Sequence, residues 1–314
     1  MEPVVLYSMP GNEARAEDLA RACGERAVVA AVSVHRFPDG ETLVRVQPPA
    51  AGARVVLVCS LNDPDARTVP LLMAAATLRE LGAASVGLLA PYLAYMRQDR
   101  SFEPGQAVSA RHYARLLSAH FDWLLTVDPH LHRIHDLSEI YTVPARVLHA
   151  APVLADWIRR EVARPLIIGP DGESAQWATD VAARVGAPVV VVDKLRNGDR
   201  DVASTPPALQ SFSGLTPVLL DDIASSGRTL VAVLEHLRGA GLAPPVCAVV
   251  HGLFAGDALQ AMRAAGAARI ACTDTTSGID RPGVDIVSLT EPLAQAMLEL
   301  AAACAPRNRE EAIP

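Results

Sequence analysis

The stretch VLLDDIASSGRT at residues 218–229 decides how the rest of the chain is interpreted. An apolar run ends in two acids, Asp221 and Asp222, and a short loop of small residues then leads to a helix that begins near Thr229. Ligands of open parallel sheets bind at the carboxyl ends of the strands. Small residues at a helix N-terminus offer N–H groups to an anion, and paired carboxylates accept from vicinal hydroxyls or hold a metal. The stretch therefore predicts a sugar-phosphate site; the alternative is a capped helix start in which Asp222 only forms a turn.

Similar apolar runs recur along the whole chain and alternate with amphipathic stretches of helical spacing. This alternation predicts parallel sheets with helices on both faces. The runs are continuously apolar, as strands that are buried on both faces require. The expected strands are 4–7, 55–60, 86–90, 123–128, 166–169, 189–193, 218–222, 246–251 and 269–274, and the expected helices are 13–23, 65–81, 109–120, 152–162, 174–185, 229–240 and 256–265.

The two halves of the chain repeat one pattern. Three strands of the first half have counterparts displaced by roughly 160 residues, namely 4–7 and 166–169, 55–60 and 218–222, and 86–90 and 246–251. We therefore expect two tandem α/β domains, at residues 1–147 and 148–314, related by duplication. Each domain is expected to be a mainly parallel sheet flanked by helices, with the linker near residues 143–152.

Composition excludes several classes of protein. The 314 residues carry 28 basic and 35 acidic side chains, a net charge of −7, so nothing global favours nucleic acid or an anionic membrane as a partner. No uncharged, proline-free apolar run reaches the length of a membrane span, and the first residues lack the basic region of a signal peptide. The five cysteines include no CxxC pair, which argues against a disulfide framework and a zinc ribbon. We expect a cytoplasmic protein.

All but one of the basic residues are arginines. Of the 28, only Lys194 is a lysine. Because ammonium and guanidinium groups differ in geometry and hydration, a lone lysine can mark a position where arginine fails. Lys194 and Arg196 lie in a glycine-containing loop after the expected strand 189–193, where two cations could close over phosphates and stabilise charge on a transferring group. The alternative is a solvated basic loop.

Six motifs, in order along the chain, resemble those of ribose-phosphate pyrophosphokinases. They are RFPDGE at 36–41, PYLAYMRQDR at 91–100, DPH at 128–130, GPD at 169–171, DKLR at 193–196 and the acidic stretch at 218–229. The resemblance implies two phosphoribosyltransferase-like domains, the first with a degenerate phosphate loop. It also implies a Mg²⁺-dependent reaction that transfers the β,γ-pyrophosphoryl group of ATP to the 1-hydroxyl of ribose 5-phosphate. The products would be 5-phosphoribosyl 1-pyrophosphate and AMP.

The resemblance further implies roles for individual residues. The catalytic residues would be Lys194, Arg196 and His130, and the metal site would be His130 and Asp171. Ribose 5-phosphate would be bound by Asp221, Asp222, Ser225, Ser226, Gly227, Arg228 and Thr229. ATP would be bound by Phe37, Asp39, Glu41, Arg97, Gln98 and Asp99. Because the Phe37 segment would reach the site of a neighbouring subunit, we expect a homo-oligomer with a shared adenine site.

Several of these assignments have alternatives. His130 could be a structural histidine or could bond a metal-bound water or a phosphate, and the segment from Phe37 to Gly40 has the composition of an ordinary turn. The chain also departs from the family at GESAQ (172–176), at the Ser225–Thr229 loop and around His130, at Pro129 and residues 131–133, which leaves the nucleotide, the metal and any regulation open. A non-catalytic protein that binds phosphoribosyl compounds is the alternative function. A phosphoribosyltransferase acting on a base would need only one such domain.

Overall fold

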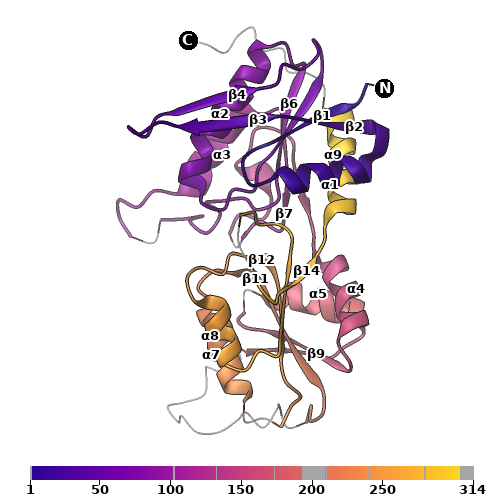
Figure 1. The fold of residues 1–314 in the computed structure, drawn as a ribbon. Coiled ribbons are helices and arrows are strands. Elements are labelled where there is room, and N and C mark those ends of the chain that lie inside the picture. The colour runs from indigo at the N-terminus through magenta and orange to yellow at the C-terminus, as the bar shows by residue number, and fades with distance from the viewer. Residues whose placement is uncertain are drawn as a thin grey trace. The chain divides into compact units, whose positions relative to one another are not determined.

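The structure is a computed structural model that describes residues 2–101, 103–131, 133–172, 174–192, 209, 211–238, 241–278 and 281–304. These residues form two compact units. The first contains the described residues up to Leu148 together with those from Thr290 onward, and the second contains those of His149–Leu289. Each unit is built on its own six-stranded sheet (Figure 1).

The sheet of the first unit is parallel throughout, in the order β2-β1-β5-β6-β7-β8. Its strands are β1 (Val4–Ser8), β2 (Ala27–Ala30), β5 (Arg54–Val58), β6 (Ser85–Ala90), β7 (Trp123–Val127) and β8 (Ala145–Leu148). Helices α1 (Glu13–Cys23) and α9 (Thr290–Ala303) lie on one face, and α2 (Pro64–Glu80) and α3 (Ser109–His120) lie on the other (Figure 1). The unit also contains two short 3-10 helices, η1 (Gly24–Arg26) and η2 (Leu137–Glu139).

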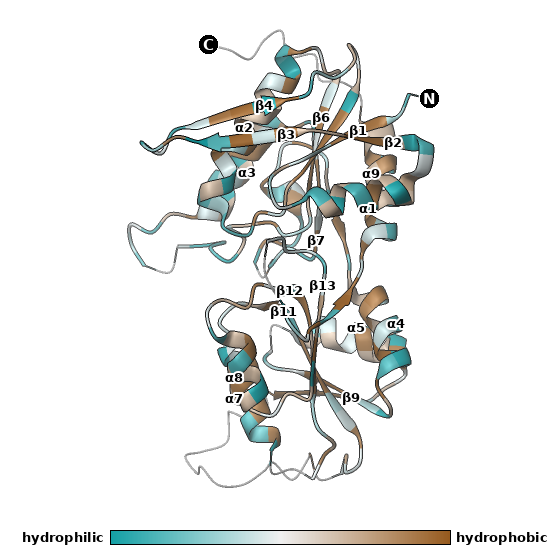
Figure 2. Ribbon diagram, in the orientation of Figure 1, coloured by the Kyte–Doolittle hydropathy of each residue, from teal (hydrophilic) through white to brown (hydrophobic). Residues whose placement is uncertain are grey.

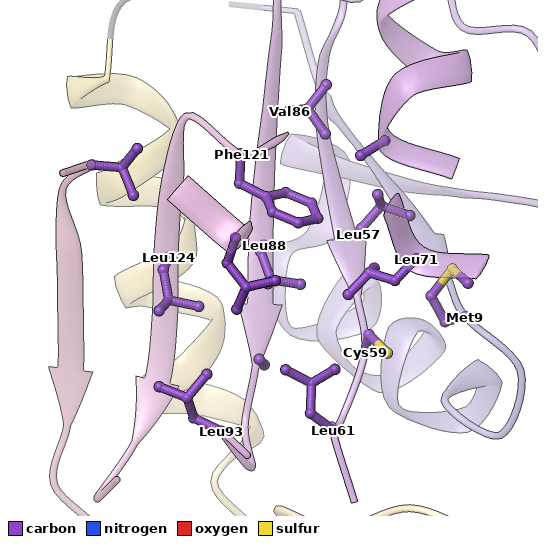
Figure 3. Packing of buried hydrophobic residues seen from close by; sticks show 14 of the residues in the cluster. Met9, Leu57, Cys59, Leu61, Leu71, Val86, Leu88, Leu93, Phe121 and Leu124 are labelled. Atoms are coloured by element: carbon purple, nitrogen blue, oxygen red, sulfur yellow. The ribbon is translucent and has the colours of Figure 1, made fainter. Parts of the chain in front are cut away.

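One hydrophobic cluster of this unit lies between the sheet and helices α2 and α3, and α1 and α9 bury side chains of their own on the other face. Leu88, Phe121 and Leu124 point to the same side of the sheet, close to Leu57 and to Leu71 of α2 (Figure 3). All five are 1 % exposed or less. Complete burial of a side chain of this size contributes about 1.5–3 kcal/mol. The sheet strands are hydrophobic along their length and the outer faces of the helices carry the polar residues (Figure 2), as two-sided burial requires.

One glycine inside the first sheet is needed for packing. Gly87 pairs with Trp123 across β6 and β7. A Cβ built on Gly87 would fall 2.1 Å from two atoms of the Trp123 ring, far inside van der Waals contact. A glycine within a strand often marks such a close approach. The large indole ring therefore packs over β6 only because residue 87 has no side chain.

A separate antiparallel hairpin is inserted into the first unit. Strands β3 (Val32–Arg36) and β4 (Thr42–Val46) pair from Val32 with Val46 to Arg36 with Thr42. The hairpin extends over α2, with its turn at the outer end (Figure 1). Its turn is the segment Phe37–Glu41, in which Gly40 has a φ of +94°. The sequence has a turn composition here, but the two strands of the hairpin were not among the expected elements.

The second unit is also built on a parallel sheet, in the order β10-β9-β11-β12-β13-β14. Its strands are β9 (Pro165–Gly169), β10 (Val189–Val191), β11 (Thr216–Ala224), β12 (Val246–Gly252), β13 (Arg269–Thr273) and β14 (Asp285–Val287). Its helices are α4 (Ala151–Glu161), α5 (Ala175–Val185), α7 (Arg228–Leu237) and α8 (Ala258–Ala264). Helices α4 and α5 cover one face of the sheet and α7 and α8 cover the other (Figure 1).

The two sheets have the same strand order when each is numbered from its own first strand. In both, the second strand lies outside the first, and the remaining four follow in sequence. Strands β1, β5 and β6 correspond to β9, β11 and β12, which are the pairs that the sequence repeat predicts. All nine expected strands and all seven expected helices are present. The edge strands β2, β8 and β14 and the helix α9 were not among the expected elements.

The last helix changes the expected domain organisation. Residues 148–314 were expected to form the second domain, but α9 packs against α1 and belongs to the first unit. Leu293, Ala296 and Met297 form its buried stripe, and the carbonyl of Ala301 accepts from Arg54 at 3.2 Å. The division of the units at Leu148 is one residue from the expected boundary. The residues proposed as the linker contain β8 rather than an extended connection.

Candidate active site

The paired acids lie near the carboxyl end of β11. The strand runs two residues further than expected, because Ile223 and Ala224 still pair with β12. Asp221 and Asp222 are both half-buried, and the backbone N–H of Asp222 donates to Oδ1 of Asp221 at 3.0 Å. The acids are therefore held on a rigid strand rather than on the loop that follows it.

The surroundings of Asp221 disfavour its charged form. Its burial, together with the nearby carboxylates of Asp222 and Asp171, raises the pKa of Asp221 well above its ordinary value. These negative charges disfavour ionisation of one another. A bound cation or a set of donating hydroxyls would relieve this effect. The arrangement therefore suits a ligand that brings one or both.

The loop after β11 is shaped by Gly227. This residue precedes α7 with a φ of +69°, and a Cβ on it would lie 3.3 Å from Cγ of Met262. Ser226, Arg228 and Thr229 are exposed, and their side chains make no hydrogen bond to the part of the chain that the structure describes. The N–H groups of the first turn of a helix have no partner within the helix and carry its positive dipole end. The loop can therefore bind an anion such as a phosphate.

The loop is supported from beneath by the connection between β12 and α8. The N–H groups of Leu253 and Phe254 donate to the carbonyl of Ala224, and Ala255 donates to the carbonyl of Ser225, each at 2.9 Å. These bonds satisfy the carbonyl groups on the inner side of the loop. The loop is thus fixed to the scaffold by its backbone.

Asp171 lies on a tight turn after β9. Its Oδ1 accepts from the backbone N–H of Ser174 at 2.8 Å, and the Ser174 hydroxyl donates to the Asp171 carbonyl at 2.8 Å. Gly169 makes this turn possible, since a Cβ there would lie 2.8 Å from the Ser174 hydroxyl. The sequence departs here from a glycine-rich turn, but no pattern in it indicates that Ser174 orients Asp171.

The topology of the second sheet brings Asp171 and the acids of β11 together. Strands β9 and β11 are neighbours, and the order of strands reverses between them, because the chain passes from β9 to β10 on one side and from β11 to β12 on the other. Such a switch point leaves a crevice at the carboxyl ends of the strands, which is where open α/β sheets bind ligands. The predicted sugar-phosphate residues flank this crevice.

In the first unit, His130 follows β7. Asp128 has a φ of +28°, and its N–H donates to the carbonyl of Leu148 at 3.1 Å, which fixes the start of this loop. His130 is half-buried.

The expected ATP segment follows β6, the neighbouring strand. Arg97 is exposed and Gln98 is half-buried, with Nε2 of Gln98 donating to the carbonyl of Arg100 at 3.2 Å. Asp99 is different, because its carboxylate is buried and accepts from Arg133. No spacing rule in the sequence reveals this pair.

The other expected ATP residues form the hairpin turn between β3 and β4. Phe37 is 40 % exposed, and its ring meets His35 edge-on with centroids 4.9 Å apart. Oδ1 of Asp39 accepts from the N–H of Glu41 at 3.0 Å, and both acids are exposed. An exposed aromatic ring beside two acids on a projecting turn is available to a base or to another chain.

Comparison with known proteins defines the family. Residues 4–120 match the N-terminal domain of ribose phosphate pyrophosphokinase, and residues 136–281 match the phosphoribosyl transferase domain. Curated ribose-phosphate pyrophosphokinases include one from Halobacterium salinarum, 36 % identical over 86 % of this chain and 94 % of its own, and one from Methanopyrus kandleri, 37 % identical over 87 % and 92 %. The chain belongs to the ribose-phosphate pyrophosphokinase family.

The fold agrees with that membership. A phosphoribosylpyrophosphate synthetase structure from Mycobacterium smegmatis superposes with a TM-score of 0.81, at 22 % identity, over 96 % of this chain and 99 % of that one. As a member of this family of enzymes, the chain has the two tandem phosphoribosyltransferase-like domains that the motifs predict. Within the described residues, no helix is long and apolar enough to cross a membrane.

Two of the expected catalytic residues cannot be placed in this geometry. Lys194 and Arg196 lie outside the residues that the structure describes.

Among the described residues there is no group of three His, Cys, Asp or Glu side chains that could hold a metal ion by themselves. Mg²⁺ prefers carboxylate oxygens and keeps several of its waters, so it needs few protein ligands. The carboxylate oxygens of Asp171, Asp221 and Asp222 are of the kind that this ion prefers.

Proposed function

We propose that this chain transfers the β,γ-pyrophosphoryl group of ATP to the 1-hydroxyl of ribose 5-phosphate, with Mg²⁺ as cofactor. The hydroxyl oxygen forms a bond to the β-phosphorus, the bond from that phosphorus to the α,β-bridging oxygen breaks, AMP leaves, and the hydroxyl gives up its proton. The supporting observation is the reversal of strand order between β9 and β11, with Asp171, Asp221 and the Gly227 loop at or near the carboxyl ends of these two strands.

The crevice supports ribose 5-phosphate as the acceptor. Ser225, Ser226, Gly227, Arg228 and Thr229 would hold the 5-phosphate through the helix N-terminus and side-chain donors. Asp221 and Asp222, on the strand just before the loop, would accept from the vicinal hydroxyls of the ribose. In this assignment, the groups that bind the phosphate lie next to the groups that bind the hydroxyls. Such a site suits a sugar phosphate better than a free phosphate.

The remaining roles follow from the family motifs. We assign the metal site to Asp171 and His130, and the phosphates of ATP to Arg97 and Gln98. Magnesium would neutralise charge on the polyphosphate, and positioning and charge neutralisation account for most of the catalysis of phosphoryl transfer. Asp171 is oriented for this role by Ser174. Lys194 and Arg196 would stabilise the charge that develops on the transferring group.

The hairpin turn supports an adenine site that two subunits share. Phe37 would stack on the base, and Asp39 and Glu41 would accept from its exocyclic amine. The exposed position of all three residues on a projecting turn fits a partner outside their own unit. We therefore propose a homo-oligomer, and a fully active monomer in sedimentation at assay concentration would contradict it. All five cysteines are unpaired, which fits a reducing compartment such as the cytoplasm.

The direct test is an assay of both products. The purified chain is mixed with ATP, magnesium and ribose 5-phosphate, and AMP and phosphoribosyl pyrophosphate are measured together, with Lys194→Ala alongside. Equal amounts of both products, reduced by orders of magnitude in the variant, are expected. Release of pyrophosphate from a base-dependent reaction would indicate a phosphoribosyltransferase. Binding of phosphoribosyl compounds without either product would indicate a non-catalytic regulator.

A further inference from the structure

Asp99 and Arg133 join two loops that follow neighbouring strands. Asp99 belongs to the segment after β6, and Arg133 belongs to the segment after β7. Oδ2 of Asp99 accepts the backbone N–H of Arg133 at 3.1 Å, and Oδ1 accepts Nη1 of the same residue at 3.1 Å. One carboxylate thus holds both the main chain and the guanidinium group of one residue.

The burial of Asp99 argues against a direct contact with nucleotide. Its side chain is 1 % exposed, whereas that of Arg133 is 41 % exposed. Both oxygens of Asp99 already accept hydrogen bonds from Arg133. A buried carboxylate that loses its partner is left with an uncompensated charge, so this pair is costly to break.

Both ends of the connection lie next to residues with a proposed role. Arg133 is three residues after His130 on the same loop, and Asp99 is two residues after Arg97. The Asp99 segment is itself anchored, because the N–H of Ala110 in α3 donates to the carbonyl of Gln98 at 3.2 Å. The carboxylate therefore couples the position of the His130 loop to a segment that is fixed on the scaffold.

We propose that Asp99 is a positioning residue, which acts through Arg133 to hold the His130 loop, rather than a residue that binds ATP. The inference rests on the proposed function for the roles of His130 and Arg97. Displacement of a reacting group by about 1 Å can cost on the order of 100-fold in rate. Loss of a residue that orients a metal ligand typically costs about 10- to 100-fold in affinity or activity.

The chain offers a matched control at the other end of the same strands. Asp122 precedes β7, its side chain is 1 % exposed, and it pairs with Arg79 at 2.9 Å. Its Oδ2 also accepts the backbone N–H of Val86 at 2.7 Å. Asp122→Asn therefore removes a carboxylate with the same kinds of partner, but away from the carboxyl ends of the strands.

The test compares Asp99→Asn, Arg133→Ala, Arg133→Lys, the double variant Asp99→Asn/Arg133→Ala, and Asp122→Asn. The first readout is amide hydrogen exchange of residues 128–135 in the full chain without nucleotide or metal. We expect exchange there to rise about tenfold or more in Asp99→Asn and Arg133→Ala, with less change in Arg133→Lys and none in Asp122→Asn. Unchanged exchange in the first two variants would overturn the proposal whatever reaction the protein catalyses.

The second readout is kinetic. We expect kcat to fall about 10- to 100-fold in Asp99→Asn and Arg133→Ala, with the KM for ATP changed by less than about twofold. The double variant should be no slower than Asp99→Asn, because the two residues act as one unit. A raised KM for ATP in Asp99→Asn alone, or additive losses in the double variant, would instead make Asp99 a nucleotide ligand. An inactive wild type would overturn the proposed function and leave the exchange result to decide this inference.

Discussion

Asp63 and Gly227 occupy the same place in the two units and share one backbone conformation. Each is the last residue before the helix that follows the third strand of its sheet, and their φ angles are +61° and +69°. The turn was thus retained in both units while its chemistry changed. Val58 ends β5 and Cys59 follows it, and both are completely buried, whereas β11 carries Asp221 and Asp222 near its carboxyl end. Among the described residues, the third strand of the second sheet therefore carries the acids of the predicted sugar-phosphate site.

Replacement of Gly227 tests whether its loop binds phosphate. Asparagine and aspartate both tolerate a left-handed backbone, so Gly227→Asn and Gly227→Asp should fold, each losing about 1 kcal/mol against the Met262 contact. Only the aspartate adds negative charge to the anion site. We expect the KM for ribose 5-phosphate to rise at least tenfold more in Gly227→Asp than in Gly227→Asn, measured by steady-state kinetics. Equal effects would mean that no anion binds beside this residue.

The raised pKa of Asp221 makes a prediction about stability. For a carboxyl group whose folded pKa exceeds its unfolded value of about 4, the stabilising contribution is complete below that value and is lost as the pH rises through the folded pKa. Asp221→Asn removes this loss. The ligand-free variant should therefore be more stable than the wild type at pH 8, by on the order of 1 kcal/mol or more, and by much less at pH 5.

Thermal unfolding between pH 5 and 8, in the presence of EDTA, measures this difference. Addition of ribose 5-phosphate should reverse the order at pH 8, because the ligand stabilises the wild type and binds the variant poorly. A variant that is less stable than the wild type at every pH would show that the carboxylate contributes to the fold and not mainly to the ligand site.

The contact between Gly87 and Trp123 predicts a large effect on stability. The methyl group of Gly87→Ala would overlap the Trp123 ring. Overpacking of this kind lowers the free energy of unfolding by about 1–3 kcal/mol or more. Chemical denaturation should show the loss. Trp123→Phe removes the ring atoms that the methyl group meets, so the double variant should be more stable than the sum of the two single losses. Simple additivity would mean that the sheet relaxes elsewhere.

Removal of the Phe37 ring from the hairpin turn should change the kinetics with ATP but not the stability of the protein. Phe37→Ala removes an exposed ring, so the melting temperature should stay within about 1 °C while the KM for ATP rises roughly tenfold, as expected for the loss of one stacked base. Leu43→Ala is the matched control, since Leu43 is 48 % exposed on the same hairpin. If both variants raise the KM equally, the hairpin acts through its general placement or through subunit contacts rather than through Phe37.

Much of the fold and part of the site could be predicted from local patterns. The long apolar strands and amphipathic helices carry their period in the sequence, so all nine expected strands were found. The stretch at 218–229 likewise combined a strand, two acids and a glycine before a helix, which local chemistry alone makes interpretable. The edge strands β8 and β14 were not predicted, because each has only three or four residues and one of them is charged.

The sequence by itself determined the class of fold, its duplication and the chemistry available in the second unit, because these depend on periodicity and on residues that are close in the chain. Only the tertiary structure decided where distant residues meet. It returned α9 to the first unit, placed Asp171 and Asp221 at the same edge of the sheet on either side of a reversal in strand order, and joined Asp99 to Arg133. Contacts of this kind arise from the packing of whole elements, and no local pattern encodes them.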